Sequence, residues 1–311
     1  MGSGLLLVFL LVGTIGWRLR EGVWRPTRAL LAGVQAMATR AFDHRITVAT
    51  GDEWDDLPAA FNQTLATMEE LEVASVIQAR LFPAGPVTTP AGTFLGRSRT
   101  TQEVGGDYFD ALPGPDGTLF FLMGDVTGHG VSAALVVAMA KSAFGYLVRT
   151  GPPSPAAILD RMSALFREQL GRTLAMTCQI GCLHPDGTLR FANAGHLFPF
   201  LLQPGQPIRR LEQPSVPLGM RARRPYVDLV IDLPSDARLL FCTDGIIEAT
   251  DPAGKMFGFT GLTALLAALP PAPPAATIEA VFAALAAHTR EVPWADDVTV
   301  AILCRSAGET A

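Results

Sequence analysis

Two short stretches of the sequence carry aspartates whose positions suit metal binding. Asp107 follows Gly105-Gly106, and Asp125 follows the apolar run 119–123, with a cluster of turn residues at 113–117 between them. This pattern predicts a strand, a hairpin turn and a second strand, with the two aspartates near the ends of neighbouring strands. Carboxylates gathered at the ends of buried strands repel each other unless a cation lies among them. An oxygen-only site of this kind suits Mg²⁺ or Mn²⁺.

Two further acidic positions repeat the arrangement. Asp244 ends an apolar run and precedes a glycine, and the pair Asp296-Asp297 stands directly before another apolar run. A single Asp-Gly pair is usually only a turn. Four acidic sites at strand ends are harder to explain as turns, and they favour one shared site.

The elements predicted around these aspartates are antiparallel strands and two groups of helices. Helices are expected at 131–148, 156–170, 261–268 and 277–288. Strands are expected at 93–101, 118–126, 174–183, 189–193, 198–202, 208–211, 226–233, 238–243 and 297–304, with turn signals between them. This succession favours an α+β sandwich over a doubly wound sheet.

Length and composition limit the classes of function. The chain has 311 residues and a formal net charge of −5, with no long basic block, so nucleic acid is a poor candidate partner. The four cysteines lie in apolar runs and form no CxxC pair. We interpret Cys178, Cys182, Cys242 and Cys304 as buried, reduced thiols of a cytosolic compartment.

The N-terminal residues predict a membrane anchor. Residues 4–17 carry no charge. This uncharged run is slightly shorter than the run that a membrane-spanning helix needs. Arg18, Arg20, Arg25 and Arg28 follow, which places the downstream side in the cytoplasm. The charge order argues against a signal peptide. We expect a transmembrane or anchor segment at 1–20; the alternative is a short apolar helix that docks on the protein or dimerises.

Residues 21–72 have the texture of two amphipathic helices joined by an extended connector. Such helices cannot bury their apolar stripes alone, so a parallel homodimer is implied. The stretch resembles the HAMP signal-relay domain at Pro26, at Asp52-Glu53 and at Phe61-Asn62; the alternative is a coiled-coil spacer. Residues 73–92 are expected to be a helical linker that transmits movement to a domain at 93–306.

From about residue 74 to 304 the sequence resembles the metal-dependent phosphatases of the protein phosphatase 2C (PP2C, PPM-type) class, and more closely their bacterial SpoIIE-like branch. The motifs occur in order along the domain. They are Gln78-Ala79-Arg80-Leu81-Phe82-Pro83, Gly105-Gly106-Asp107-Tyr108-Phe109-Asp110, Gly124-Asp125-Val126-Thr127-Gly128-His129-Gly130, Ala192-Asn193-Ala194-Gly195-His196, Thr243-Asp244-Gly245-Ile246-Ile247-Glu248-Ala249 and Asp296-Asp297-Val298-Thr299. The resemblance implies a PPM-type α/β/β/α sandwich of two antiparallel sheets flanked by helices.

The resemblance also implies roles for single residues. Asp125 matches a carboxylate that bridges two metal ions, Val126 a backbone-carbonyl ligand, and Asp107 a carboxylate acting on metal-bound water. Asp244 and Asp296 match metal ligands, with Asp297 ranked behind Asp296 because many relatives carry Asn there. The implied cofactors are two Mn²⁺ or Mg²⁺ ions, and Asp107 and Asp125 are the implied catalytic residues. The substrate-binding residues are unassigned; Arg97 and Arg99 are candidates for holding phosphate.

The function implied is a metal-dependent serine/threonine protein phosphatase at the cell membrane, with its catalytic domain in the cytoplasm. The substrate implied is a phosphorylated anti-sigma factor antagonist of the STAS type. One alternative is a catalytically weak, HAMP-linked binding module that signals by protein contact, although such a module has no need of the full acidic set. Another is a HAMP-linked nucleotide cyclase, for which the acidic motifs are wrongly distributed.

Overall fold

The computed structural model of the chain describes residues 2–48, 56–151, 154–171, 174–220, 224–270 and 272–306. The chain forms two compact units, Met1–Val76 and Ile77–Ala311. The first is helical, and the second contains two β-sheets with flanking helices. The two units are described separately below.

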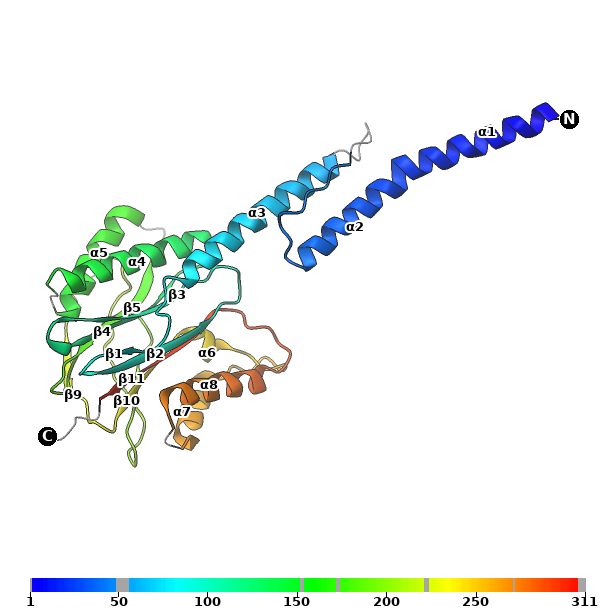
Figure 1. Cartoon of the computed structure of the whole chain (residues 1–311). Helices are drawn as coiled ribbons and strands as arrows, with labels where there is room; N and C mark the ends of the chain where they lie inside the picture. Colours follow the sequence, from blue (N-terminus) through cyan, green and yellow to red (C-terminus); the bar gives the residue numbers. More distant parts are fainter. Residues whose placement is uncertain are drawn as a thin grey trace. The chain divides into compact units, whose positions relative to one another are not determined.

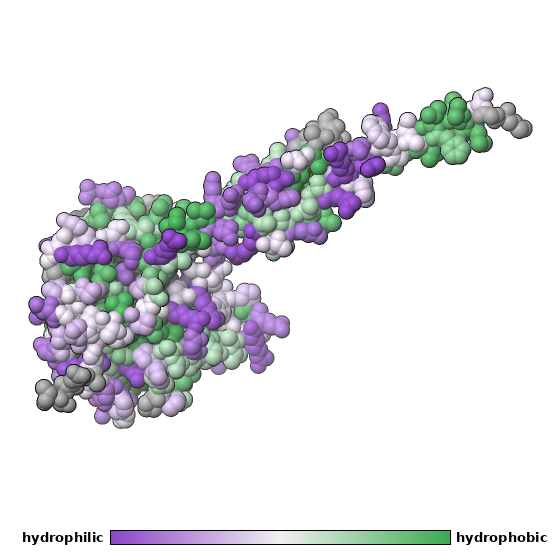
Figure 2. Space-filling view, viewed as in Figure 1, coloured by the Kyte–Doolittle hydropathy of each residue, from purple (hydrophilic) through white to green (hydrophobic). Residues whose placement is uncertain are grey.

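The first unit begins with a long apolar helix. Helix α1 (Gly2–Leu19) continues through a π-helical turn (Arg20–Trp24) into α2 (Arg25–Ala38). Figure 2 shows the hydrophobic side chains gathered along α1, and those side chains are exposed. Two described helical stretches are long and apolar enough to cross a membrane, Ser3–Ala38 and Val131–Arg149, but only the second is partly buried in the protein. Helix α1 is therefore a candidate membrane anchor.

A connector joins α2 to α3 (Asp56–Ala79), and Asn62 holds it in place. The Asn62 amide donates to the Ile46 carbonyl at 2.9 Å and accepts from the Ile46 N–H at 2.8 Å. Gly33 of α2 allows close packing, because a Cβ there would lie 2.7 Å from both Ile46 and Phe61. The two helices run in the same direction (Figure 1). The HAMP-like interpretation stays a prediction, and the Asp52-Glu53 pair on which it partly depends lies outside the described residues.

The second unit contains two sheets in which all neighbouring strands are antiparallel. Sheet A has the order β1-β2-β11-β10-β7-β8, and sheet B has the order β3-β4-β5-β6-β9. The strands of sheet A are β1 (Val87–Thr88), β2 (Gly92–Arg99), β7 (Phe200–Leu202), β8 (Arg209–Arg210), β10 (Arg238–Cys242) and β11 (Val298–Arg305). Those of sheet B are β3 (Asp107–Pro113), β4 (Leu119–Val126), β5 (Met176–Leu183), β6 (Thr188–Ala194) and β9 (Leu229–Asp232).

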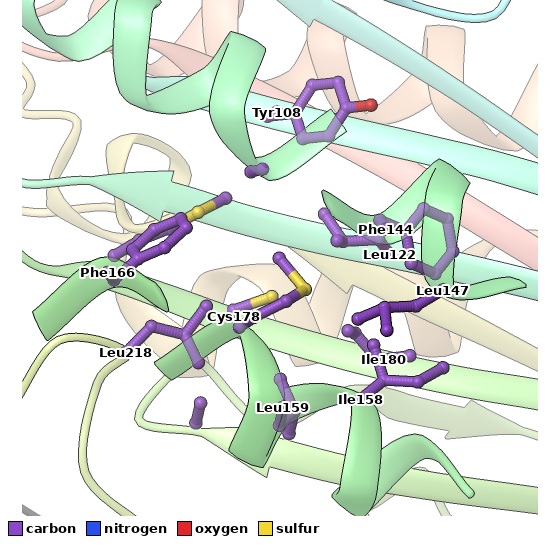
Figure 3. Packing of buried hydrophobic residues seen from close by; sticks show 14 of the residues in the cluster. Tyr108, Leu122, Phe144, Leu147, Ile158, Leu159, Phe166, Cys178, Ile180 and Leu218 are labelled. Atoms are coloured by element: carbon purple, nitrogen blue, oxygen red, sulfur yellow. The ribbon is translucent and has the colours of Figure 1, made fainter. Parts of the chain in front are cut away.

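Helices cover the outer face of each sheet (Figure 1). Helices α4 (Val131–Arg149) and α5 (Pro155–Leu170) pack on sheet B, and α6 (Asp244–Glu248), α7 (Gly258–Ala268) and α8 (Pro274–Thr289) pack on sheet A. Figure 3 shows Phe144 of α4 and Phe166 of α5 among the apolar side chains of sheet B. A second apolar cluster, which includes Phe94, Phe121 and Phe241, fills the space between the sheets. The predicted α/β/β/α sandwich is confirmed.

Short elements depart most from their predicted limits. Strand β9 begins at Leu229, not at 226, because the Tyr226 backbone does not pair with β6. The Tyr226 N–H donates instead to Asp160, and its hydroxyl donates to the Val216 carbonyl. Strand β1 pairs Val87–Thr88 with β2 inside the range 73–92 that was predicted as linker. All four cysteines are free, and three of them are buried.

Candidate metal centre

Two of the predicted aspartates face each other across one strand pair. Asp107 opens β3 and is paired in register with Asp125 near the end of β4. Side chains alternate between the faces of a strand, and the odd-numbered neighbours Phe109 and Met123 lie in the cluster between the sheets. Both carboxylates therefore stand on the inner face of sheet B, as directly opposed cross-strand neighbours.

The other two acidic positions come from sheet A. Asp244 opens α6 two residues after the end of β10, and Asp296 immediately precedes the buried Asp297 and β11. Strands β10 and β11 are paired, and the ladder continues beyond β10 because the Thr243 N–H donates to the Thr299 carbonyl at 3.1 Å. Each sheet thus contributes two acidic positions to the same end of the sandwich.

The pKa shifts show that these carboxylates influence one another. Burial, followed by repulsion from Asp244, Asp296 and Asp297, raises the pKa of Asp125 from 3.8 to about 7. Burial and then Asp125 raise the pKa of Asp107 well above its usual value. Burial and then Asp296 raise the pKa of Asp244. Negative charge at this place is therefore costly without a compensating cation.

The backbone leaves room for oxygen donors around this cluster. A Cβ at Gly106 would lie 2.8 Å from the Val126 carbonyl oxygen, 2.9 Å from that of Gly128 and 3.3 Å from Asp125 Oδ1. Only glycine leaves that space open to these oxygens. The donors are all hard oxygens, which fits Mg²⁺ or Mn²⁺. Among the described residues, no three acidic, His or Cys side chains already form a group that could hold an ion, so a bound ion would require some of the acidic side chains to change rotamer.

Both carboxylate oxygens of Asp297 accept hydrogen bonds from the loop that precedes Asp107. Its Oδ1 accepts from the Thr101 N–H at 2.8 Å and from the Thr101 hydroxyl at 3.2 Å, and its Oδ2 accepts from the Gly106 N–H at 2.9 Å. The carboxylate is buried, at 4% exposure. These bonds fix the loop that leads into Asp107.

Three hydroxyl groups near Asp107 are absent from the sequence-based set. Asp107 Oδ2 accepts from the Thr243 hydroxyl at 2.7 Å and from the Thr299 hydroxyl at 2.6 Å. Thr299 Oγ1 also lies 2.8 Å from Ser98 Oγ. Thr243 and Thr299 stand inside two of the quoted motifs, directly before Asp244 and two residues after Asp297. For Ser98 the sequence signal is its odd-even parity with inner-face neighbours on its strand.

Arg97 and Arg99, the candidates for holding phosphate, lie on the opposite face of sheet A. Arg97 pairs with Glu279 of α8. The Arg99 guanidinium lies 4.8 Å from the centre of the Phe282 ring. Both side chains are therefore directed to α8, whereas Ser98 between them points to the aspartates.

The end of α3 contacts the loop that precedes Asp107. The Gln78 amide donates to the Gly105 carbonyl at 2.7 Å and accepts from the Gly105 N–H at 3.0 Å. Gln78 is buried, at 5% exposure. Residue 105 is thus held by the helix, while residue 106 is held by Asp297.

The curated proteins that this chain is similar to include one that is about twice as long. Protein IcfG from Synechocystis sp. is 23% identical over 302 residues, which cover 82% of this chain and 48% of that protein. The chain therefore spans about half the length of the curated relative it matches.

Several solved structures share the fold. The SiaA-PP2C domain of Pseudomonas aeruginosa is 22% identical, with a TM-score of 0.68 over 78% of this chain and 98% of that chain. The RsbU and RsbW domains of Rv1364c from Mycobacterium tuberculosis are 25% identical, with a TM-score of 0.56 over 71% of this chain and 62% of that chain. RsbX in complex with magnesium is 15% identical, with a TM-score of 0.53 over 71% of this chain and 98% of that chain.

A family model agrees with these structures. The model described as Stage II sporulation protein E (SpoIIE) matches residues 115–306, which is more than half of the chain. The fold is that of the PP2C domains, and the chain belongs to the SpoIIE family.

Proposed function

We propose that this chain is a metal-dependent serine/threonine protein phosphatase. The observation that carries the proposal is the meeting of four acidic positions from two sheets at one end of the sandwich, where burial and repulsion raise the pKa values of Asp107, Asp125 and Asp244. A module that acts only by contact has no use for such a costly cluster, which makes the binding-module alternative the weaker one.

The residues that would hold the ions are Asp107, Asp125, Asp244, Asp296 and the Val126 carbonyl, and the ions would be two Mg²⁺ or Mn²⁺. We assign Asp297 to the loop that it already holds, because three hydrogen bonds engage both of its oxygens. Divalent ions bound among such carboxylates activate water and neutralise charge on a transferring phosphoryl group.

The chain's own residues provide position and charge in this scheme. Asp107 and Asp125 stand opposite each other on paired strands, which keeps their backbone positions at a fixed spacing. Cys242 is the cysteine nearest to Asp244 in the sequence, but it lies in the apolar cluster on the outer face of sheet A, and burial raises the pKa of its thiol to about 12. A thiolate nucleophile is therefore disfavoured, and the site suits direct attack by water.

The proposed substrate is a phosphorylated STAS-type anti-sigma factor antagonist. Two facts support this class: membership of the SpoIIE family, and the Mycobacterium tuberculosis relative, in which an RsbU domain occurs with an RsbW domain. The proposed location is the cell membrane, through α1, with the phosphatase unit in the cytoplasm. The arginines after α1 support that orientation.

The proposed regulation acts through α3. A HAMP-like homodimer of the 21–72 region would move this helix. The Gln78 contacts to Gly105 would carry the movement to the loop before Asp107. This gives the linker a direct means of ordering the site.

The test is phosphate release from a phosphorylated STAS-domain protein by the full chain in membranes, with Mn²⁺ titrated from zero. We expect metal-dependent release that falls at least about 100-fold in Asp244→Asn, because a ligand is lost. Asp236→Asn, an exposed aspartate before β10, is the matched control and should match wild type. Equal release by Asp244→Asn, or no release at any Mn²⁺ concentration, would overturn the proposal.

A further inference from the structure

The hydroxyl groups around Asp107 come from three strands of the opposite sheet. Ser98 lies on β2, Thr299 on β11, and Thr243 directly follows β10. Each lies an even number of residues along its strand from a residue that faces sheet B, namely Phe94, Ala301 and Phe241, and therefore lies on the same face of its strand. Thr243 and Thr299 are fully buried, and Asp107 is 2% exposed. The apolar layer between the sheets thus ends in a small polar layer at the acidic cluster.

The direction of each hydrogen bond follows from counting protons. Thr243 Oγ1 accepts from the Thr299 N–H at 3.0 Å, so its own proton is available for Asp107 Oδ2. Thr299 has one hydroxyl proton, and an ionised carboxylate has none to give. Thr299 therefore donates to the charged acceptor, Asp107 Oδ2, at 2.6 Å, and Ser98 Oγ lies 2.8 Å from the same threonine oxygen.

Both protons meet the same oxygen of Asp107. Oδ2 accepts two short bonds, whereas no hydrogen-bond donor among the described residues reaches Oδ1. The β-branched threonines have restricted χ1 angles in strands, which fixes their hydroxyls. The carboxylate consequently cannot rotate without losing two buried hydrogen bonds.

We propose that Thr243 and Thr299 are positioning residues for the divalent metal. They hold Oδ2 of Asp107 so that Oδ1 is the oxygen offered to the ion. The inference rests on the proposed function, because it assumes that Asp107 is a ligand. Ser98 completes the arrangement by fixing the Thr299 hydroxyl. Hydrogen-bonded partners of this kind orient metal ligands and strengthen binding.

The test uses Thr299, because valine has the same shape and keeps the backbone N–H that Thr243 accepts. Mn²⁺ affinity of the full chain is measured by titration calorimetry in detergent, without substrate. We expect Thr299→Val to weaken Mn²⁺ binding about tenfold. Thr299→Ser keeps the hydroxyl and should restore binding to within about twofold of wild type.

The matched control is Thr93→Val. Thr93 lies on β2 of the same sheet, and its hydroxyl pairs with Thr88 at 3.0 Å, away from the acidic cluster. A role in stability alone predicts equal Mn²⁺ affinity for Thr299→Val and Thr93→Val. A positioning role predicts that only Thr299→Val weakens binding.

A second variant keeps the proposal testable if Thr299→Val does not fold. If circular dichroism shows that Thr299→Val is unfolded, Ser98→Ala decides the matter, with a weakening of about threefold expected. Wild-type Mn²⁺ affinity in the folded variants, alongside Mn²⁺-dependent phosphate release by wild type, overturns this inference alone. Absence of both Mn²⁺ binding and phosphate release in wild type overturns the proposed function, and the inference with it.

Discussion

The acidic residues at the end of the sandwich differ in what surrounds each carboxylate. Asp125 and Asp244 are held in place by the backbone and repelled by their neighbours. Asp107 accepts two hydroxyl protons on one oxygen. Asp297 uses both oxygens on backbone and hydroxyl groups of one loop. Substitutions at these positions should therefore have different signatures.

Asp125→Asn should stabilise the metal-free protein at high pH. The pKa of Asp125 is raised in the folded state, from 3.8 to about 7. Its contribution to stability is therefore fully present below about pH 4 and is lost as pH rises through about 7. Urea unfolding in EDTA should show Asp125→Asn more stable than wild type by about 2 kcal/mol at pH 8, and no such gain at pH 4.

Saturating Mn²⁺ should reverse the order of the two proteins at pH 8, because only wild type keeps the full ligand set. Asp236→Asn should follow wild type at every pH. Equal pH profiles for wild type and Asp125→Asn without metal would contradict the raised pKa.

Asp296→Ala and Asp297→Ala should separate metal binding from stability. Removal of Asp297 leaves the buried Gly106 N–H and the Thr101 N–H without their acceptor. We expect a loss of about 3 kcal/mol in the metal-free protein. Removal of the exposed Asp296 should change that stability by less than about 1 kcal/mol but abolish tight Mn²⁺ binding. Unfolding curves and calorimetry on the same samples check both, and a reversed pattern would make Asp297 the ligand.

The sequence was sufficient to identify the aspartates but not the residues that hold them. Asp107, Asp125 and Asp244 each stand beside glycine, and Asp296-Asp297 stand directly before an apolar run, which are local signals. The contacts of Asp107 with Thr243 and Thr299 join residues 136 and 192 positions apart. No local pattern carries that information, because it depends on which strands of the two sheets face each other.

At the scale of elements, two hydrogen bonds join the end of α3 to the loop before Asp107. Gln78→Ala removes two buried hydrogen bonds from Gly105, which together are worth about 2 kcal/mol. Hydrogen exchange at residues 104–106 should quicken at least about tenfold. Gln102→Ala, an exposed glutamine in the same loop, is the control. Unchanged exchange in Gln78→Ala would remove the structural basis for regulation through α3.

Asn62 should act on the first unit without affecting the second. Asn62→Ala loses both bonds to Ile46, and hydrogen exchange of the Ile46 amide should rise at least about tenfold. Mn²⁺ affinity should stay at the wild-type value. Gln63→Ala, at an exposed neighbouring position, should leave both quantities unchanged. A weaker Mn²⁺ affinity in Asn62→Ala would show that the two units are coupled even without a signal.

Long elements could be predicted from the sequence together with their bounds, whereas the shortest ones were either missed or predicted too long. Helices α4 and α5 and strands β4, β5 and β11 have apolar patterns long enough to identify them, and their bounds agree with prediction within a few residues. Strand β1 has two residues and was not predicted, whereas β8 was predicted at 208–211 and has only two residues, Arg209–Arg210. Their existence depends on pairing with β2 and β7, which outweighs local preference.

At the scale of the whole molecule, exposure distinguishes the two apolar helices. We expect the full chain to remain in carbonate-washed membranes, and a chain lacking residues 1–24 to remain soluble. The reason is that α1 is exposed and apolar, whereas Phe144 and other α4 residues lie in the core. Leu135→Asp, on the exposed side of α4, should leave the membrane fraction unchanged. A truncated chain that stays with membranes would point to α4 or another surface.

The position of β11 in sheet A has a consequence for synthesis of the protein. The last strand of the chain lies between β2 and β10 in the middle of the sheet, so the sheet is incomplete until residue 305 has left the ribosome. Asp296 and Thr299 arrive with that strand, and contacts of such large sequence separation form late in folding. A chain that stops before β11 therefore lacks Asp296, one of the four acidic positions, together with Thr299, and we expect such a chain to be inactive toward the phosphoprotein.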